Sequence, residues 1–197
     1  MKILIAILTT LFTCLLASGA EAPIPDKEPI GLKNKIYLLP TIHSRHLKKG
    51  EFYNLKHLAW VISEIKADII CAEITPQALD KVKAGKKDRR LSCLPEYTEV
   101  ILKLQKDLGY NIIPCSAWTA ERNFKTIGVK AMSDAHYEFI AKALDTHTNQ
   151  QKRIIISFGS GHISNLLTHL RKRDDIYIID YRVNLKEQRE LHQKTNQ

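Results

Sequence analysis

One stretch of the sequence decides the fold: Arg153-Ile-Ile-Ile-Ser-Phe-Gly-Ser-Gly-His-Ile-Ser-Asn-Leu-Leu167. Its first half contains a continuous apolar run, 154–156, which is typical of a buried strand. Its second half continues into apolar residues at helical spacing: Ile163, Leu166, Leu167 and Leu170. The period therefore changes across Gly159 to Gly161, which predicts a strand, a glycine turn and a helix that starts at His162. This unit builds ligand sites in α/β proteins.

The rest of the chain repeats the same alternation of strands and helices. Further apolar runs of strand length lie at 36–39, 68–72, 111–114 and 176–179, and helical patterns lie at 52–65, 97–108 and 132–144. Strands that are apolar on both faces favour a mainly parallel sheet covered on both sides. We therefore predict a single α/β domain with a mainly parallel central sheet flanked by helices.

The two ends of the chain differ from this pattern. Residues 1–22 of the 197 combine Lys2, an apolar run and small residues, which predicts a signal peptide and a secreted or periplasmic protein. An uncleaved membrane anchor or a lipid-modified Cys14 are the alternatives. We expect a proline-containing lead-in at 23–32, the folded domain at 33–183 and a polar C-terminal tail at 184–197.

The net charge bears on which molecules the protein could bind, and the cysteines bear on whether it contains a disulfide. The formal net charge is +9, with basic clusters at 81–90 and 171–173. No aromatic residues interleave with these clusters, so we expect no nucleic acid; a solvated face is the simplest interpretation, and peripheral contact with an anionic envelope surface is the alternative. Outside the signal peptide, we expect Cys71 to be a thiol packed in the core. If a disulfide forms, Cys93 and Cys115 are the likelier pair.

Three ionisable residues follow strands of the predicted sheet: His43, Glu73 and His162. The carboxyl ends of parallel strands share one edge, where ligands bind in open α/β sheets. Two histidines and one carboxylate are a common ligand set for a divalent metal with an open position for water. Glu73 could instead act as the general base. A capping role for His162, a loop position for His43 and a surface position for Glu73 are the structural alternatives.

Other residues near this edge carry weaker hypotheses. The turn Gly159, Ser160 and Gly161 could present backbone N–H groups to an anion such as a phosphate or a substrate carboxylate. His46 could add a ligand. Trp118 could contact a substrate, although packing in the core is favoured. His136, like His147, His169 and His192, shows no metal-ligand spacing and is left out.

These motifs resemble a known group of proteins. The segments 36–43, 67–73 and 156–162 resemble the TraB/PrgY and GumN proteins, including the TIKI proteases, a group that also looks related to erythromycin esterases and ChaN haem-binding proteins. Gly159-Ser-Gly-His162 matches the family's Gly-x-x-His, and Glu73 matches its glutamate, whereas Pro40 stands where the first such motif has glycine.

The resemblance implies a metal-dependent hydrolase, and together with the predicted signal peptide we expect an exported enzyme that cleaves a peptide or ester bond. His43, Glu73 and His162 would hold manganese, cobalt or zinc and act on a peptide or small-molecule substrate. The alternative is a non-catalytic haem-, metal- or anion-binding protein of the same fold. An interaction protein that uses its basic surface is a third class, in which these residues would be dispensable.

Overall fold

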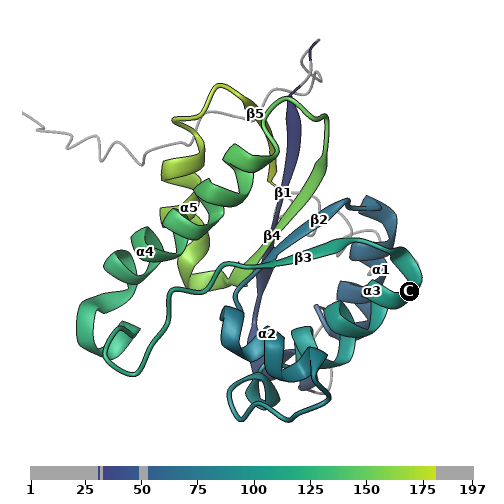
Figure 1. The fold of residues 1–197 in the computed structure, drawn as a ribbon, viewed down its shortest axis with the longest axis vertical. Coiled ribbons are helices and arrows are strands. Elements are labelled where there is room, and N and C mark those ends of the chain that lie inside the picture. Colours follow the sequence, from purple (N-terminus) through teal and green to yellow (C-terminus); the bar gives the residue numbers. More distant parts are fainter. Residues whose placement is uncertain (1–30, 32, 49–52, 181–197) are drawn as a thin grey trace, which may run out of the picture.

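The computed structural model describes residues 31, 33–48 and 53–180 and contains one parallel sheet (Figure 1). Its strands are β1 (Asn34–Thr41), β2 (Ile69–Ala72), β3 (Asn111–Pro114), β4 (Arg153–Gly159) and β5 (Ile176–Asp180). Their order is β3-β2-β4-β1-β5, and every neighbouring pair is parallel. The predicted α/β class and all five predicted strands are confirmed. The assigned signal peptide and tail lie outside the described residues.

The helices divide between the two faces of the sheet (Figure 1). The α-helices are α1 (Leu55–Ile65), α2 (Pro76–Lys83), α3 (Leu102–Leu108), α4 (Phe124–Thr146) and α5 (Ser160–Leu170); the short turns are η1 (His43–Leu47), η2 (Leu91–Cys93) and η3 (Glu96–Ile101). Helices α1, α2 and α3 pack with η3 on one face, and α4 and α5 pack on the other. Within the described residues, no helix combines the length and apolar character needed to cross a bilayer.

Alternate residues along the strands pack into two hydrophobic cores, one on each face of the sheet. Leu39 and Ile155 pack toward α1 and η3, whereas Leu38, Ile154 and Ile156 pack toward α4 and α5. This two-sided burial explains why the strands are continuous apolar runs. The sheet is therefore the middle of three layers.

Pro40 does not interrupt β1. It lies opposite Phe158 of β4, beyond Leu38, where the pairing with β5 ends. A residue without an N–H is tolerated where one neighbouring strand has already stopped. The chain therefore continues to His43 as expected from the sequence.

Two local details differ from the predictions. Strand β4 runs directly into α5, so His162 lies inside the first turn of the helix rather than after a separate glycine turn. The long helix begins earlier than position 132 and is broken at Gly128, whose φ of 79° is left-handed. A left-handed residue cannot continue a right-handed helix, which explains the break.

Cys93 and Cys115, the pair favoured by the sequence if a disulfide forms, are not joined in the structure. All three described cysteines are free, and Cys93 is exposed while Cys115 is buried. The Cys115 thiol interacts with the Cys71 thiol, and this hydrogen bond, together with burial, raises the pKa of Cys115. The two thiols share the core between the sheet and α4.

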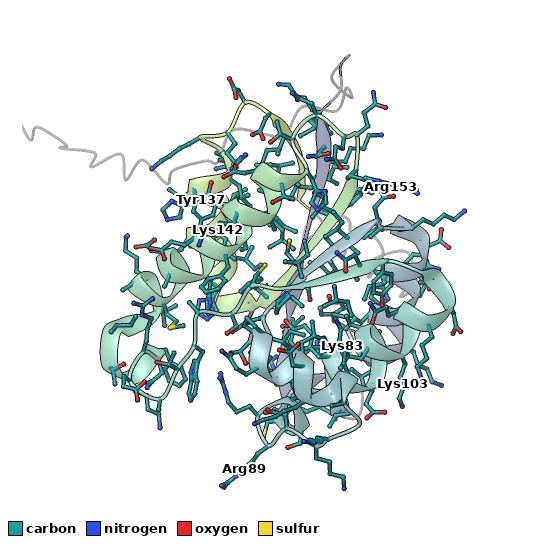
Figure 2. The ribbon with its side chains drawn as sticks, in the orientation of Figure 1. Lys83, Arg89, Lys103, Tyr137, Lys142 and Arg153 are labelled. Atoms are coloured by element: carbon teal, nitrogen blue, oxygen red, sulfur yellow. The ribbon has the colours of Figure 1, made fainter. Side chains whose placement is uncertain are left out.

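Basic side chains are spread over the helices rather than gathered on one element. Lys83, Lys103 and Lys142 are exposed on α2, α3 and α4 respectively (Figure 2). Within the basic cluster at 81–90, Asp88 binds the Lys81 ammonium at 3.1 Å. Part of the positive charge is therefore neutralised locally.

Candidate metal centre

A cavity of about 450 Å³ lies at the carboxyl edge of the sheet. His43, Glu73 and His162, the three residues predicted from the strand ends, all line it. His136, which the sequence analysis left out, lines it too. The sheet thus gathers three histidines and one carboxylate from four different parts of the chain.

Glu73 directly follows β2, and its carboxylate is held from one side. Its Oε2 accepts a hydrogen bond from the Gly159 backbone N–H at 2.6 Å. Its own N–H bonds the Ser157 carbonyl at 3.1 Å and the Tyr97 hydroxyl at 3.0 Å. The Tyr97 hydroxyl in turn donates to the Ser157 carbonyl at 2.8 Å. The backbone and one oxygen of Glu73 are therefore fixed, which leaves Oε1 facing the cavity.

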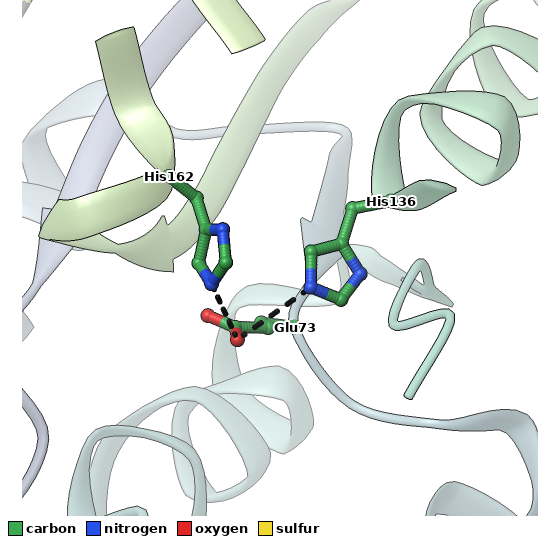
Figure 3. Close-up of side chains that lie close together, drawn as sticks. All are labelled: Glu73, His136 and His162. Carbon is green, nitrogen blue, oxygen red and sulfur yellow. Dashed lines mark ion pairs between the residues drawn. The ribbon is translucent and has the colours of Figure 1, made fainter. Parts of the chain in front are cut away.

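Two imidazoles approach this free oxygen (Figure 3). Glu73 Oε1 lies 3.7 Å from His162 Nε2 and 3.9 Å from His136 Nε2. The ligand atoms of these three residues all lie within 4.8 Å of one another, so the group could hold a metal ion. Ligand atoms around a tetrahedral zinc ion are separated by about 3.3 Å. A small inward shift would bring the observed distances to that value.

The hydrogen bonds of His162 leave Nε2 available as a ligand. Its Nδ1 lies 2.8 Å from the Ser133 Oγ, and the Ser133 hydroxyl already donates its hydrogen to the Val129 carbonyl at 2.7 Å. Nδ1 must therefore carry the proton and donate it, so that Nε2 keeps its lone pair. Burial lowers the pKa of His162, against the opposing attraction of Glu73. A neutral ring in this tautomer is suited to bind a cation.

His136 has the opposite tautomer. Its Nδ1 accepts a hydrogen bond from the Ala117 N–H at 2.9 Å, so in the neutral ring Nε2 carries the hydrogen. The ring is 1% exposed, and burial, with smaller contributions from His162 and Arg90, lowers the pKa of His136 to about 3. As oriented, His136 is a neutral hydrogen-bond donor toward Glu73, and it could bind a metal through Nε2 only by giving up the bond from Ala117.

His43 lines the same cavity, but it is not one of the three residues whose ligand atoms lie within 4.8 Å of one another. Its Nδ1 pairs with Glu96 Oε1 at 2.6 Å, a hydrogen bond that raises the pKa of His43 although burial opposes it. A carboxylate that holds one ring nitrogen in this way orients the other nitrogen toward a metal. A Cβ placed on Gly159 would lie 2.8 Å from His43 Nε2 and 3.3 Å from Glu73 Oε2, so imidazole and carboxylate flank the same glycine.

The backbone at His43 is unusual. Its φ of 51° lies in the left-handed region, which a residue with a Cβ rarely adopts. Strain of this kind persists where surrounding contacts fix the residue, and it concentrates at functional sites. Here the buried Glu96, which is 0% exposed, supplies such a contact.

In the predicted anion cradle, Gly159 contacts Glu73. The Gly159 N–H is occupied by Glu73, and Gly159 has a φ of −52°, so its absent side chain serves close approach rather than a special backbone conformation. Ser160 and Gly161 are exposed in the first turn of α5. Both ring nitrogens of His46 bond backbone groups, Ile42 N–H at 3.1 Å and the Tyr53 carbonyl at 2.7 Å, so its role is to hold the loop.

Glu96 and His136 are the two residues that sequence reasoning missed. Each left a signal: His136 shares a helix face with Met132 and Ile140 at spacings of four, and Glu96 directly precedes the buried Tyr97. A polar residue among buried ones requires a partner.

Comparison with known proteins identifies no relative, because no family model, no curated protein and no solved structure matches the chain.

Proposed function

We propose that this protein is an exported metal-dependent hydrolase of peptide or ester bonds, with a divalent cation held by His43, Glu73 and His162. The apolar N-terminal pattern supports export, and the resemblance to TraB/PrgY and GumN proteins supports hydrolysis. One observation carries the choice of ligands. His43 and His162 each direct Nδ1 to a partner, Glu96 and Ser133, so that Nε2 is the nitrogen each neutral ring leaves free to bind a cation.

The donor set suits a catalytic rather than a structural cation. Three protein ligands of the His, Glu, His type leave coordination positions for water and substrate. A bound divalent cation would supply an acidified water and polarise the carbonyl of the substrate. The cavity of about 450 Å³ beside these residues is of the size that small ligands occupy.

The protein itself orients the Glu73 carboxylate and supplies a hydrogen-bond donor. The Gly159 N–H holds one oxygen of Glu73, which directs the other toward the cavity. The His136 Nε2–H can donate to the oxygen of the scissile carbonyl, where negative charge grows during attack. Because burial holds the pKa of His136 near 3, the ring remains a neutral donor across the ordinary pH range.

Hydrolysis of a panel of p-nitrophenyl esters and short peptides, with added manganese, cobalt or zinc, tests this function. We expect turnover that requires metal and that falls by more than about a hundredfold in Glu73→Gln and in His162→Ala. Ser160→Ala is the control, because a serine nucleophile in the first turn of α5 would lose activity in that variant instead. If the protein bound metal but turned over none of these substrates, the hydrolase would be refuted and the non-catalytic binding protein would be favoured.

A further inference from the structure

The cavity has a second polar wall, opposite in charge to Glu73. Besides the histidines and the glutamate, it is lined by Arg89 and Arg90 and by apolar side chains: Leu94, Trp118, Phe124 and Met132. Arg89 projects outward from the fold (Figure 2). Arg90 is therefore the cation best placed to act on a molecule in the cavity.

Arg90 is an exposed residue whose side chain lies on Trp118 and whose backbone is held by Asp88. Its guanidinium carbon lies 3.3 Å from the centre of the Trp118 ring. Its backbone N–H donates to Asp88 Oδ1 at 3.0 Å, and the same oxygen accepts from the N–H of the buried Leu91 at 3.2 Å. A long side chain fixed in this way loses less conformational entropy when it binds a ligand.

The stacked arrangement leaves hydrogen-bonding capacity unused. A guanidinium that lies on an aromatic face keeps its N–H donors in the plane of the group, where they match the two oxygens of a carboxylate. Among the described residues, no carboxylate lies within ion-pair distance of Arg90, whereas Arg173, for comparison, pairs with Asp145 and Asp175. Partial burial also lowers the pKa of Arg90, although its charge is retained.

Trp118 links this cation to the histidine that faces Glu73. The preceding residue, Ala117, bonds His136 through its N–H, and Ala117 packs with Met132 and Ala135 of α4, against which Trp118 also lies. The apolar side chains of Trp118, Phe124 and Met132 line the same cavity as Arg90 and the histidines. A molecule that fills the cavity would meet a cation, an apolar surface and the histidines.

We propose that Arg90, stacked on Trp118, binds a carboxylate of the substrate, so that the enzyme acts on small anionic amides or esters with an apolar group, of the kind represented by N-acylated amino acids. This inference rests on the proposed hydrolase function for the cleavage but not for the binding. The substrate carboxylate would lie beside Arg90, which makes no ion pair among the described residues, although Asp88 and Glu73 attract its charge at longer range.

Binding can be measured without turnover, because the chain contains two tryptophans and the other, Trp60, lies on α1. In a Trp60→Phe background, Trp118 fluorescence reports on the cavity of the metal-free protein. N-acetyl-phenylalanine and its neutral amide are the matched probes. We expect the carboxylate to bind at least about tenfold more tightly, because charge-assisted bidentate bonds exceed neutral ones by that amount.

Arg90→Gln should remove the difference between the two probes, and Arg90→Lys should retain part of it. Lys142→Gln, which removes the same charge from an exposed position that does not line the cavity, should leave the difference unchanged. Equal binding of both probes, absence of binding, or an unchanged preference in Arg90→Gln would overturn the inference. Carboxylate-selective binding without hydrolysis would refute only the hydrolase, whereas hydrolysis insensitive to Arg90 would refute only the carboxylate subsite.

Discussion

His136 should make the folded protein sensitive to acid. Its ring is 1% exposed, and its Nδ1 accepts from the Ala117 N–H, so a second proton would displace that bond and bury a charge. Burial, with His162 and Arg90, lowers the pKa of His136 to about 3. In the unfolded chain a histidine titrates near 6.5. The unfolded state therefore binds a proton that the folded state does not, and stability falls as the pH falls from about 6.5 toward 3.

The size of this effect follows from the two pKa values. Lowering the pH from 7 to 4.5 should cost about 2.5 kcal/mol of unfolding free energy through His136 alone. Other histidines at the site also titrate: the lowered pKa of His162 adds to the loss, and the raised pKa of His43 opposes it. Comparison with a variant at position 136 separates the contribution of that ring from the others.

Urea unfolding of the metal-free protein at pH 7 and at pH 4.5 measures the effect. His136→Asn is the suitable variant, because an asparagine oxygen can still accept from the Ala117 N–H but does not titrate. We expect the wild type to lose about 2.5 kcal/mol more than His136→Asn between the two pH values. Equal losses in both proteins would show that the ring is not held neutral, and the donor role assigned to it would be wrong.

Three further experiments test the architecture of the site. Gly159→Ala adds a methyl group 2.8 Å from a site imidazole, so we expect a loss of about 1–3 kcal/mol and weaker metal binding, whereas Gly161→Ala, with open space around it, should be neutral or stabilising; similar effects of both would contradict the close approach. Tyr97→Phe removes the hydroxyl that bonds the Glu73 N–H and should weaken metal binding, while Tyr110→Phe should only lower the melting temperature; unchanged metal affinity in Tyr97→Phe would refute this coupling. Of the three described cysteines, only Cys93 should react with a thiol reagent in the native state, and rapid reaction of a second thiol would contradict the burial.

The fold could be predicted from the sequence because its signals are local. The period changes between strand and helix within a few residues, and two-sided burial makes each strand a continuous apolar run. Gly109 ends the helix before β3 with a φ of 73°, as its position predicts. The start of α4 was missed because Phe124 is 52% exposed, so its first turns lack a buried apolar face.

The site could be predicted only where the backbone topology decides it. His43, Glu73 and His162 follow strands, so parallel pairing places them at one edge whatever the helices do. His136 and Glu96 lie on helical segments, and whether such side chains reach that edge depends on how the helices pack. Glu96 also lies in the π-helical turn η3, and a local irregularity of this kind cannot be predicted from hydrophobic periodicity.

The ligand assignment is tested most directly by titrating the metal-free protein with Co²⁺ and recording its visible absorption. We expect one tightly bound ion per chain in the wild type, loss of the absorption in His43→Ala, Glu73→Gln and His162→Ala, and its retention in His136→Asn. Retention in His43→Ala together with loss in His136→Asn would contradict this assignment, because the cation would then be held by the histidine whose Nδ1 accepts the Ala117 N–H.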